Sequence, residues 1–420
     1  MAAAVRALVV AAGLAGLGAA AAWSVRLGWA DYLARQETVE STEKALRVTP
    51  DQEAYWVRLA LLTAEDAPAR SEEALERAVR LNPADGRAWI ELGLRKEMEG
   101  KVEEAERCFL RAAEVDREYV PRWTLVNYYF RRGERAKFIE WARAAAEMVH
   151  GDAAALFRLC GAMEEDGRLI DRLDMRRPDV RAAYLEYLLG RGRADLAMPA
   201  ARKVLEGGRE EDTAALLDAC DRLLEAKRVD DAAEIWNGLS ERHRISAGRV
   251  DADKGPVVAN GGFAAPGGRG FDWRLAELEG VSASGEEAPG GLRLTFSGKQ
   301  PEECEVLSGF LPLKAGTRYS MKFQYRTEAI AAGAGLRWRV TEVDGGTTLA
   351  EGESLSAESE TQGGMEFETP RDCRLGRLAL RYQRAAGTTR IAGYVVLRML
   401  EVTPRAQGPA AGPPSPRVMK

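Results

Sequence analysis

The sequence predicts a multidomain chain in which an α-helical solenoid is followed by an antiparallel β-sandwich. Apolar residues recur at helical spacing from about residue 35 to residue 245, in a background rich in alanine, leucine, glutamate and arginine. From Val257 onward, apolar residues instead alternate with polar ones in short runs bounded by glycine or proline. The change of period falls at the glycine-rich stretch NGGFAAPGGRGFDW, residues 260–273. The helical and the extended segments are therefore expected to form separate domains.

Length and charge limit the classes of protein to which the chain can belong. Its 420 residues suffice for two or three domains, each with its own core. The 60 basic and 65 acidic residues give a formal net charge of −5, which argues against a nucleic-acid binder held by phosphate neutralisation. Only two histidines occur, His150 and His243, so a histidine-based zinc site or a Ser-His-Asp relay is disfavoured.

The five cysteines form neither a disulfide framework nor a zinc site, because their number is odd, their spacing is wide and no CxxC pair occurs. Cys108, Cys160 and Cys220 lie in apolar helical stretches and are predicted to pack as small hydrophobic residues. Cys304 and Cys373 share the C-terminal domain, where their spacing neither demands nor forbids a bridge.

Residues 1–29 are predicted to be an N-terminal transmembrane anchor. Nineteen uncharged, mostly apolar residues, 7–25, lie between Arg6 and Arg26. As a helix they would span roughly 28 Å, close to the hydrocarbon thickness of a bilayer. The alternative is a cleaved signal segment, since three alanines precede Trp23 and fit a small-residue cleavage site. Both alternatives predict that the rest of the chain lies across the membrane.

Residues 30–246 are predicted to form helical repeats. In the unit that starts at Gly86, large residues occupy positions 4, 7 and 24 and small residues occupy positions 8, 20 and 27. Small residues there let two antiparallel helices approach closely. The residues of this pattern are Trp89, Leu92, Gly93, Ala105, Phe109 and Ala112, and Trp123 follows Trp89 by 34 residues. The segment resembles the tetratricopeptide repeat family in this pattern, with about five to six units, although 151–178 departs from it.

The resemblance to tetratricopeptide repeats implies a concave groove, lined by the first helix of each pair, in which a protein partner docks. The groove positions of this family are 2, 5, 9 and 12 of each unit. The alternative is that these residues form the solvated face of a structural spacer. The predicted protein-binding residues are Arg87, Ile90, Leu94, Glu97, Thr124, Tyr128 and Arg131. The tryptophans of the pattern are assigned to the core.

Residues 247–256 are predicted to be a linker, and residues 257–403 a β-sandwich. The strand signals are spaced as in a sandwich rather than in alternating strand–helix units. They lie in 291–298, 317–327, 335–343, 376–385 and 390–402. Residues 404–420 contain five prolines and no acidic residue, and are predicted to be a disordered tail.

Three features of the sandwich segment resemble jelly-roll carbohydrate-binding modules. They are NGGF at 260–263, Trp273 behind it, and LPLKAGTRYSMKFQYRTE at 311–328. The resemblance implies a jelly roll that contacts polysaccharide. In that family an acidic residue associated with a structural calcium ion often follows the Asn-Gly-x-Phe start, whereas this chain has Ala264. No metal site and no cofactor are therefore predicted.

Sugars bind such sandwiches by stacking on flat aromatic rings, while polar side chains hydrogen bond to the hydroxyls. The candidate carbohydrate-binding residues are Trp273, Trp338, Asp272, Arg337 and Arg339. Alternation along the strand places Trp338 on the buried side if its arginine neighbours are solvated. A core position is therefore the alternative for each tryptophan.

The chain contains no catalytic signature, because GxSxG, the Walker motif, HExxH and the EF-hand loop are all missing. The acidic pair Glu302-Glu303 lies in a predicted loop that offers nothing to raise a carboxyl pKa. The chain is therefore predicted not to be an enzyme, and a glycan-modifying hydrolase is the disfavoured third class.

The layout resembles tetratricopeptide proteins of bacterial exopolysaccharide assembly and export systems. By this resemblance the chain is predicted to be a membrane-anchored envelope scaffold whose repeats dock a protein and whose sandwich contacts polysaccharide. Its place would be the bacterial inner membrane, with the soluble part in the periplasm, or the secreted or periplasmic space after signal cleavage. The alternative function is a protein–protein adaptor whose sandwich is a structural or assembly module without sugar binding.

Overall fold

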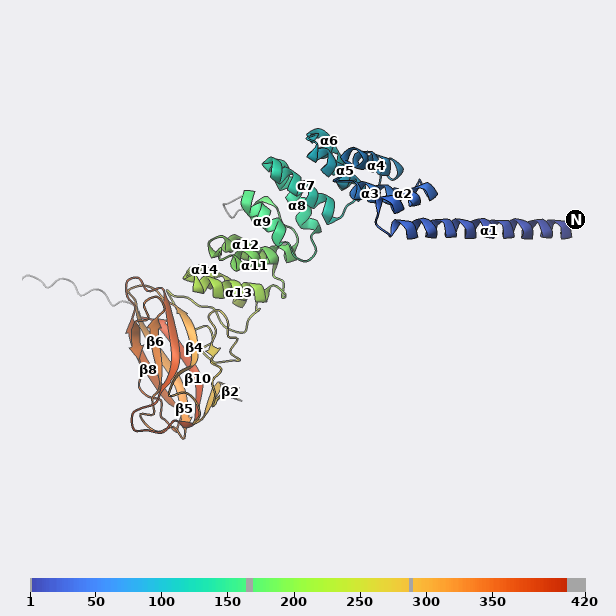
Figure 1. The fold of residues 1–420 in the computed structure, drawn as a ribbon. Coiled ribbons are helices and arrows are strands. Elements are labelled where there is room, and N and C mark those ends of the chain that lie inside the picture. The colour runs from blue at the N-terminus through green and yellow to red at the C-terminus, as the bar shows by residue number, and fades with distance from the viewer. Residues whose placement is uncertain (1, 164–168, 287–289, 406–420) are drawn as a thin grey trace, which may run out of the picture. The chain divides into compact units, whose positions relative to one another are not determined.

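The computed structural model describes residues 2–163, 169–286 and 290–405 (Figure 1). In these residues, helices α1 to α14 precede strands β1 to β10, and the strands form two five-stranded antiparallel sheets. The predicted fold class is confirmed. The helices are α1 (Ala2–Ala34), α2 (Val39–Val48), α3 (Glu53–Leu62), α4 (Pro68–Leu81), α5 (Gly86–Met98), α6 (Val102–Val115), α7 (Tyr119–Arg132), α8 (Arg135–Met148), α9 (Ala154–Met163), α10 (Leu169–Arg172), α11 (Pro178–Gly190), α12 (Ala194–Gly207), α13 (Thr213–Glu225) and α14 (Val229–Glu241).

The chain divides into two compact units, Met1–Glu165 with Asp171–Arg177, and Asp166–Ile170 with Pro178–Lys420. The domain boundaries expected from the sequence stay predictions. Of the predicted tail at 404–420, the residues from 406 onward lie outside the described residues, and Pro404 ends β10.

The first unit is a row of antiparallel helix pairs. α3 packs on α4, α5 on α6 and α7 on α8, and each pair contacts the next along the chain. Gly93 on α5 lies so close to α6 that a Cβ there would be 2.6 Å from Cε1 of Phe109. Ala105 and Ala112 are fully buried in the same pair. The small residues therefore permit the close helix approach that the repeat pattern predicts.

Two indoles tie neighbouring pairs together. The Nε1–H of Trp56 donates to the carbonyl oxygen of Pro50 at 2.8 Å, and that of Trp89 donates to the carbonyl oxygen of Pro83 at 3.0 Å. Proline cannot continue a helix, so each proline lies in the turn that ends one pair. Each tryptophan thereby fixes the first helix of the following pair to that turn.

α1 joins an apolar segment to the first helix pair without a break. Its part Leu8–Ala34 is long and apolar enough to cross a membrane, and its length and composition suit an anchor and a signal sequence equally. At the far end, Ala30 and Ala34 are buried against Ala45 of α2. The end of α1 therefore serves as the first helix of the first pair.

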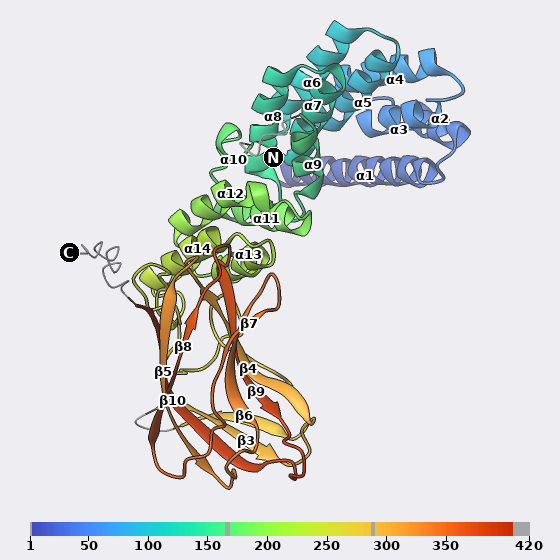
Figure 2. The ribbon, with the colours of Figure 1, turned by 90° about the vertical axis from the view of Figure 1, so that its left-hand side faces the viewer.

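In the second unit, α11 with α12 and α13 with α14 form two more hairpins, followed by the sandwich (Figure 2). The strand orders are β1-β4-β9-β6-β7 and β2-β3-β10-β5-β8. Trp338, Tyr319, Tyr382 and Phe296 are among the large side chains fully buried between the sheets. The strands are β1 (Arg274–Leu275), β2 (Val281–Gly285), β3 (Leu292–Ser297), β4 (Glu303–Pro312), β5 (Arg318–Glu328), β6 (Leu336–Glu342), β7 (Thr348–Glu351), β8 (Thr361–Glu368), β9 (Leu375–Gln383) and β10 (Ala392–Pro404).

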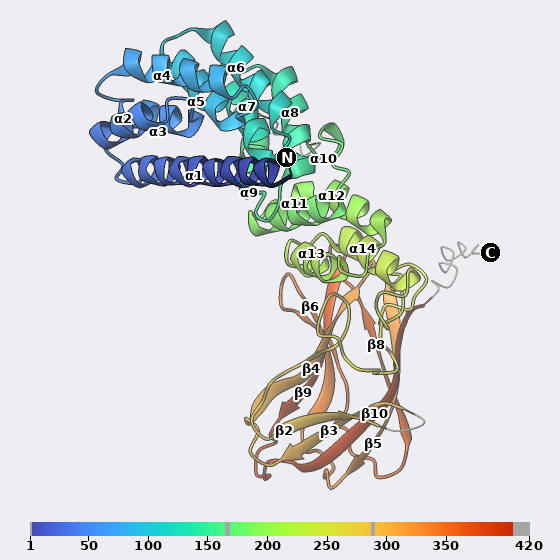
Figure 3. The same ribbon diagram turned by 90° about the vertical axis from the view of Figure 1, so that its right-hand side faces the viewer.

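The glycine-rich stretch 260–273 packs the sandwich against α13 and α14 (Figure 3). The Asp221 carboxylate on α13 accepts hydrogen bonds from the Gly270 N–H at 2.7 Å, from Nε of Arg269 at 2.8 Å and from Nη2 of Arg274 at 2.8 Å. Gly270 has a φ of 55°, and a Cβ there would lie 2.5 Å from Cε3 of Trp236 on α14. Glycine alone combines this backbone conformation with this approach. The stretch therefore holds the last helix pair as well as forming the predicted turn.

Candidate functional site

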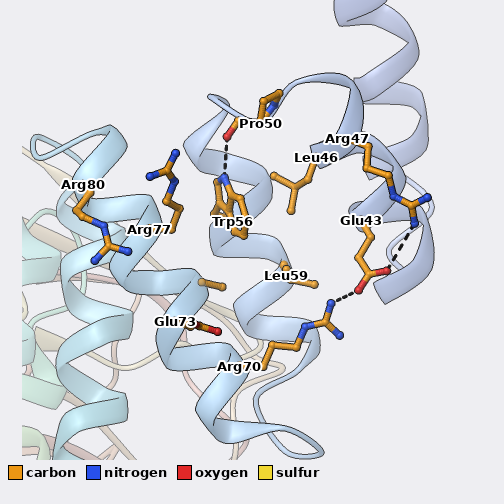
Figure 4. Close-up of a pocket in the computed structure, with 11 residues that line it drawn as sticks. Glu43, Leu46, Arg47, Pro50, Trp56, Leu59, Arg70, Glu73, Arg77 and Arg80 are labelled. Carbon is orange, nitrogen blue, oxygen red and sulfur yellow. Dashed lines mark hydrogen bonds and ion pairs between the residues drawn. The ribbon is translucent and has the colours of Figure 1, made fainter.

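A hollow of about 620 Å³ opens between α2, α3 and α4 in the first unit. α2 and α4 form two sides, and α3 lies between them (Figure 4). The lining residues are Glu43, Leu46, Arg47, Pro50, Trp56, Leu59, Arg70, Glu73, Ala74, Arg77 and Arg80. We refer to it as the α2–α4 hollow.

The charged side of α4 reaches the α2–α4 hollow through helical spacing. Arg70, Glu73, Arg77 and Arg80 recur at intervals of three or four residues, so they lie on one face of the helix. The opposite face carries the buried apolar side chains of the repeat. The helix begins at Pro68, in the first position, where a missing N–H costs nothing.

The centre of the α2–α4 hollow is apolar. The Trp56 indole is only half-buried, and its Nε1–H is held by the Pro50 carbonyl oxygen at 2.8 Å. Leu46, Leu59 and Ala74 are buried and continue the apolar surface. An indole fixed in this way offers a surface on which an aliphatic or aromatic side chain can pack.

The rim carries an excess of positive charge. The Glu43 carboxylate accepts a hydrogen bond from Arg70 and lies 4.0 Å from Nη2 of Arg47. Arg80 lies 3.5 Å from Glu76, which is outside the lining. Arg77 is exposed and has no ion-pair or hydrogen-bond partner in the part of the chain that the structure describes. Four arginines and two glutamates give the lining a formal charge of +2.

A second hollow, of about 410 Å³, lies on the other side of α3. Its lining includes Ala54, Val57 and Leu61, which occupy groove positions 2, 5 and 9 of that repeat, and also the predicted groove residue Arg87. The helical period turns these positions away from Trp56. Unit 1 therefore offers one hollow on its predicted groove and another on the opposite side of the same helix.

Two other predicted groove residues contact each other. Nη2 of Arg131 on α7 donates to both carboxylate oxygens of Glu97 on α5, at 2.8 and 3.0 Å. The ion pair joins the first helices of two neighbouring repeats. A ligand at this point of the groove would have to compete with it.

The remaining predicted groove residues differ in exposure. Leu94 is exposed, whereas Ile90 and Thr124 are half-buried. Tyr128 is buried, and its hydroxyl donates to the Val102 carbonyl oxygen at 3.1 Å. Tyr128 therefore supports the wall of the groove from inside the repeat. Peptide capture by these residues stays a prediction.

Trp273 and Trp338 lie in the core of the sandwich. Their side chains are 2% and 0% exposed, and their ring centroids are 5.8 Å apart. Phe263 stacks on Trp273 with a centroid distance of 5.1 Å. A sugar needs an open aromatic face, and neither indole presents one. Both rings therefore have the surroundings of core residues, which is the alternative to a sugar-binding role. Carbohydrate binding by these rings stays a prediction.

The polar members of the predicted sugar site are separated. The buried Asp272 carboxylate accepts hydrogen bonds from Asn260 Nδ2 at 2.9 Å, from Gly267 N–H at 2.7 Å and from the N–H of Trp273 at 2.7 Å, so it organises the glycine-rich stretch. Arg337 and Arg339 are half-buried on the outer face of β6. The structure therefore does not bring the predicted sugar-binding residues together at one exposed surface.

The described residues contain no group of three or more His, Cys, Asp or Glu side chains placed to hold a metal ion. The five cysteines are unpaired, and burial raises the pKa of Cys160 to about 12. Glu302 lies 3.2 Å from Arg384, and Glu303 accepts a hydrogen bond from Arg381.

The sequence analysis did not predict the α2–α4 hollow. Its only signal was the recurrence of Arg70, Arg77 and Arg80 on one face of a helix. Such a stripe is typical of the solvated face of a repeat helix. The hollow depends on how α2 and α4 pack on either side of α3, which no local pattern contains.

No protein-family model matches the chain, and no curated protein sequence matches it. Among solved structures, the chain is similar to a family 4 carbohydrate-binding module at 12% identity, over 35% of this chain and 99% of that one, with a TM-score of 0.29. It is similar to MamA at 18% identity, over 40% and 85% of the two chains, with a TM-score of 0.25. It is also similar to YrrB, described as a TPR protein with an unusual peptide-binding site, at 14% identity over 50% and 95%, with a TM-score of 0.25. At these values none of the three supports an inference about function.

Proposed function

We propose that this protein is a non-catalytic, membrane-anchored scaffold whose helical repeats dock a partner protein and whose sandwich contacts polysaccharide. The observation that carries the docking function is the α2–α4 hollow, where an apolar centre lies beside four arginines. A row of packed helix pairs holds such a surface rigid. Little free energy is therefore lost in ordering this surface when a partner segment binds.

The docked segment is expected to be acidic and to carry one apolar side chain. A partner carboxylate would form charge-assisted hydrogen bonds with Arg77, whose guanidinium no described residue engages. The apolar side chain would pack on the half-exposed ring of Trp56. A volume of about 620 Å³ accommodates a short segment rather than a folded domain.

Fluorescence anisotropy of labelled peptides tests this docking. The full chain in zwitterionic detergent is titrated with a short Glu-rich peptide that carries one leucine, and with the same peptide after every glutamate is replaced by lysine. The acidic peptide is expected to bind and the basic one is not. Arg77→Glu is expected to weaken binding by about 10- to 150-fold, because it replaces a charge-assisted bond with repulsion.

Arg107→Glu provides the matched control, because Arg107 is exposed on α6 and does not line the α2–α4 hollow. The same change of charge outside the α2–α4 hollow is expected to alter affinity by about twofold or less at physiological salt. Equal losses in both variants would mean that the peptide responds only to the overall charge of the protein. Unchanged affinity of Arg77→Glu would rule out the α2–α4 hollow as the docking site.

The polysaccharide function and the location are extensions of this proposal. The resemblance of the sandwich segment to carbohydrate-binding modules supports a role in exopolysaccharide assembly or export. The apolar length of α1 supports a single membrane span. The location that we propose is a bacterial inner membrane, with the soluble part in the periplasm. N-terminal sequencing of the mature protein from membrane and soluble fractions tests the anchor. A soluble chain that begins after Ala22 would mean a cleaved signal segment instead.

A protein–protein adaptor without sugar binding is the second candidate, and two observations favour it. Trp273 and Trp338 are buried, and the glycine-rich stretch packs the sandwich on α13 and α14. Solenoids need their terminal repeats capped, and the sandwich would then serve as that cap. Affinity electrophoresis of the full chain in gels that contain exopolysaccharide from the source cell separates the two candidates. Retardation supports the scaffold that contacts polysaccharide, and unchanged mobility supports the adaptor.

A further inference from the structure

Four arginines lie on the outer face of the β1-β4-β9-β6-β7 sheet. Arg337 and Arg339 come from β6, and Arg377 and Arg381 come from β9. The two strands are neighbours, and the register places Arg337 directly opposite Arg381. We call these four residues the arginine face. Like charges in directly opposite positions destabilise a sheet, so this arrangement needs an explanation.

The acidic residues nearby do not balance the arginine face. Glu351 on β7 lies 2.9 Å from Nη2 of Arg339 and 3.8 Å from Nη1 of Arg337, so one carboxylate is shared by two guanidinium groups. On β4, Glu305 lies 2.8 Å from Arg377. Glu303, also on β4, pairs with Arg381. Four arginines therefore face three glutamates, in a chain whose overall formal charge is −5.

The hydrogen-bond donors of the arginine face also exceed the available acceptors. The Nε atoms of all four arginines are buried and have no hydrogen-bond partner among the described residues. A guanidinium carries five N–H donors, and buried donors in native proteins are ordinarily satisfied. The face is therefore short of acceptor atoms as well as of negative charge.

Two small residues lie between the arginines of this face. Ala379 of β9 and Ser308 of β4 are opposite each other in the register and are buried. Nη2 of Arg377 donates to Oγ of Ser308 at 3.2 Å, so the side chain lies across the sheet. The four arginine side chains remain between 17% and 42% exposed. The guanidinium groups are thus partly accessible on this surface.

No open aromatic ring accompanies the arginine face among the described residues of this sheet surface. The outward ring of Phe310 is covered by the Arg274 guanidinium, whose Cζ lies 4.7 Å from the ring centroid. Stacking of neutral sugars or of nucleobases needs a free aromatic face. The surface is therefore suited to recognition by charge and by hydrogen bonds.

We propose that the arginine face binds an acidic polysaccharide through the carboxylates of its uronate residues. The inference rests on the proposed polysaccharide contact of the sandwich and specifies its chemical class. A planar guanidinium matches a carboxylate with two parallel hydrogen bonds. Arg337 and Arg381 lie about 5 Å apart across the strands, Arg337 and Arg339 about 7 Å apart along β6, and Arg377 and Arg381 about 13 Å apart along β9. A polymer that carries a carboxylate on every sugar can therefore engage more than one of them. The carboxylates would bind the accessible part of the guanidinium groups and add the negative charge that this face lacks.

Affinity electrophoresis of the full chain in zwitterionic detergent tests this inference, with polygalacturonate as the acidic polymer, dextran as the neutral one and duplex DNA as an unrelated polyanion. Polygalacturonate is expected to retard the protein, and dextran is not. The double variant Arg337→Gln/Arg381→Gln is expected to lose affinity by at least about tenfold. The midpoint temperature of its thermal unfolding is not expected to fall, because the like-charge pair is removed. If the two arginines served only to stabilise the fold, the substitutions would lower this temperature.

The matched control is Arg293→Gln/Arg326→Gln, which removes the same charge from the outer face of the other sheet. It is expected to retain affinity within about twofold. Loss in this control alone would move the sugar contact to the other sheet and overturn the inference. Equal retardation of the wild type and the Arg337→Gln/Arg381→Gln variant by dextran would also overturn the inference, while the proposed polysaccharide contact would stand.

Stronger binding of DNA than of polygalacturonate would also overturn the inference and indicate a nucleic-acid surface. No retardation by any polymer would overturn both the inference and the polysaccharide contact. The peptide titration with Arg77→Glu reports on protein docking independently, so the two failures remain distinguishable.

Discussion

Gly270→Ala is the sharpest test of how the sandwich is joined to the last helix pair. The new Cβ would lie 2.5 Å from Cε3 and 2.6 Å from Cζ3 of Trp236, and 3.2 Å from Sγ of Cys220. Carbon atoms in favourable contact are about 3.5–4.0 Å apart, so the chain must move by about 1 Å. The helix and the glycine-rich stretch would therefore be pushed apart at this point.

The cost follows from two effects. Overpacking of a close contact costs about 1–3 kcal/mol. The φ of 55° adds about 1 kcal/mol for a residue with a Cβ. Together they lower the free energy of local opening by about 2–4 kcal/mol, which corresponds to hydrogen exchange that is about 30- to 700-fold faster.

Hydrogen–deuterium exchange of the full chain measures this effect. The informative amide is that of Gly270 or its substitute, which donates to Asp221. Gly262→Ala is the matched control in the same stretch, because no atom lies within 4 Å of its Cβ position. Gly261→Ala is expected to loosen β10 instead, since its Cβ would lie 2.4 Å from the Leu400 carbonyl oxygen. Equal exchange at residue 270 in the Gly270→Ala and Gly262→Ala proteins would refute the reasoning.

Two further predictions concern the cores of the units. Trp338→Ala is expected to lower the free energy of unfolding by about 3–5 kcal/mol, measured by chemical denaturation; wild-type stability would contradict the core position. Lys96→Met removes the cation that Glu72, Glu76 and Glu104 share and leaves Glu72 with Lys101 alone, so it is expected to cost about 1–3 kcal/mol. The exposed Lys44→Met is expected to cost less than about 1 kcal/mol. The Lys96 hydrogen bond lowers the pKa of Glu72, so its stabilisation is present above the ordinary carboxyl range and is lost as the pH falls through the lowered pKa. Between about pH 7 and about pH 3, the denaturant concentration at the unfolding midpoint should therefore fall more steeply for the wild type than for Lys96→Met. Parallel pH dependences of the two proteins would contradict the pairing of Lys96 with Glu72.

The sequence predicts most of the architecture because repeats and strands leave local patterns. Gly93 and Phe109 pack as their repeat positions require. The alternation predicted at 335–343 and 376–385 corresponds to β6 and β9. Each of these features depends on residues within one helix pair or one strand.

The candidate sites could not be predicted in the same way, because they depend on contacts between distant residues. The α2–α4 hollow requires Glu43 and Arg70, which are 27 residues apart, to face each other. Trp273 follows a loop rather than an alternating run, and it is buried against Phe263 and Trp338. Alternation alone gives the orientation of Trp338 but not the alignment of Arg337 with Arg381 across two strands.

The central claim is that the α2–α4 hollow docks an acidic segment of a partner protein, and site-specific photo-crosslinking in the source cell tests it most directly. A photoreactive residue is placed at position 77, in the hollow, and in a separate protein at position 107, outside it. The account predicts a crosslink to one protein from position 77 only, through a peptide rich in Asp and Glu with an apolar residue among them. Equal crosslinking from both positions, or crosslinks from position 77 to peptides without acidic character, would contradict it.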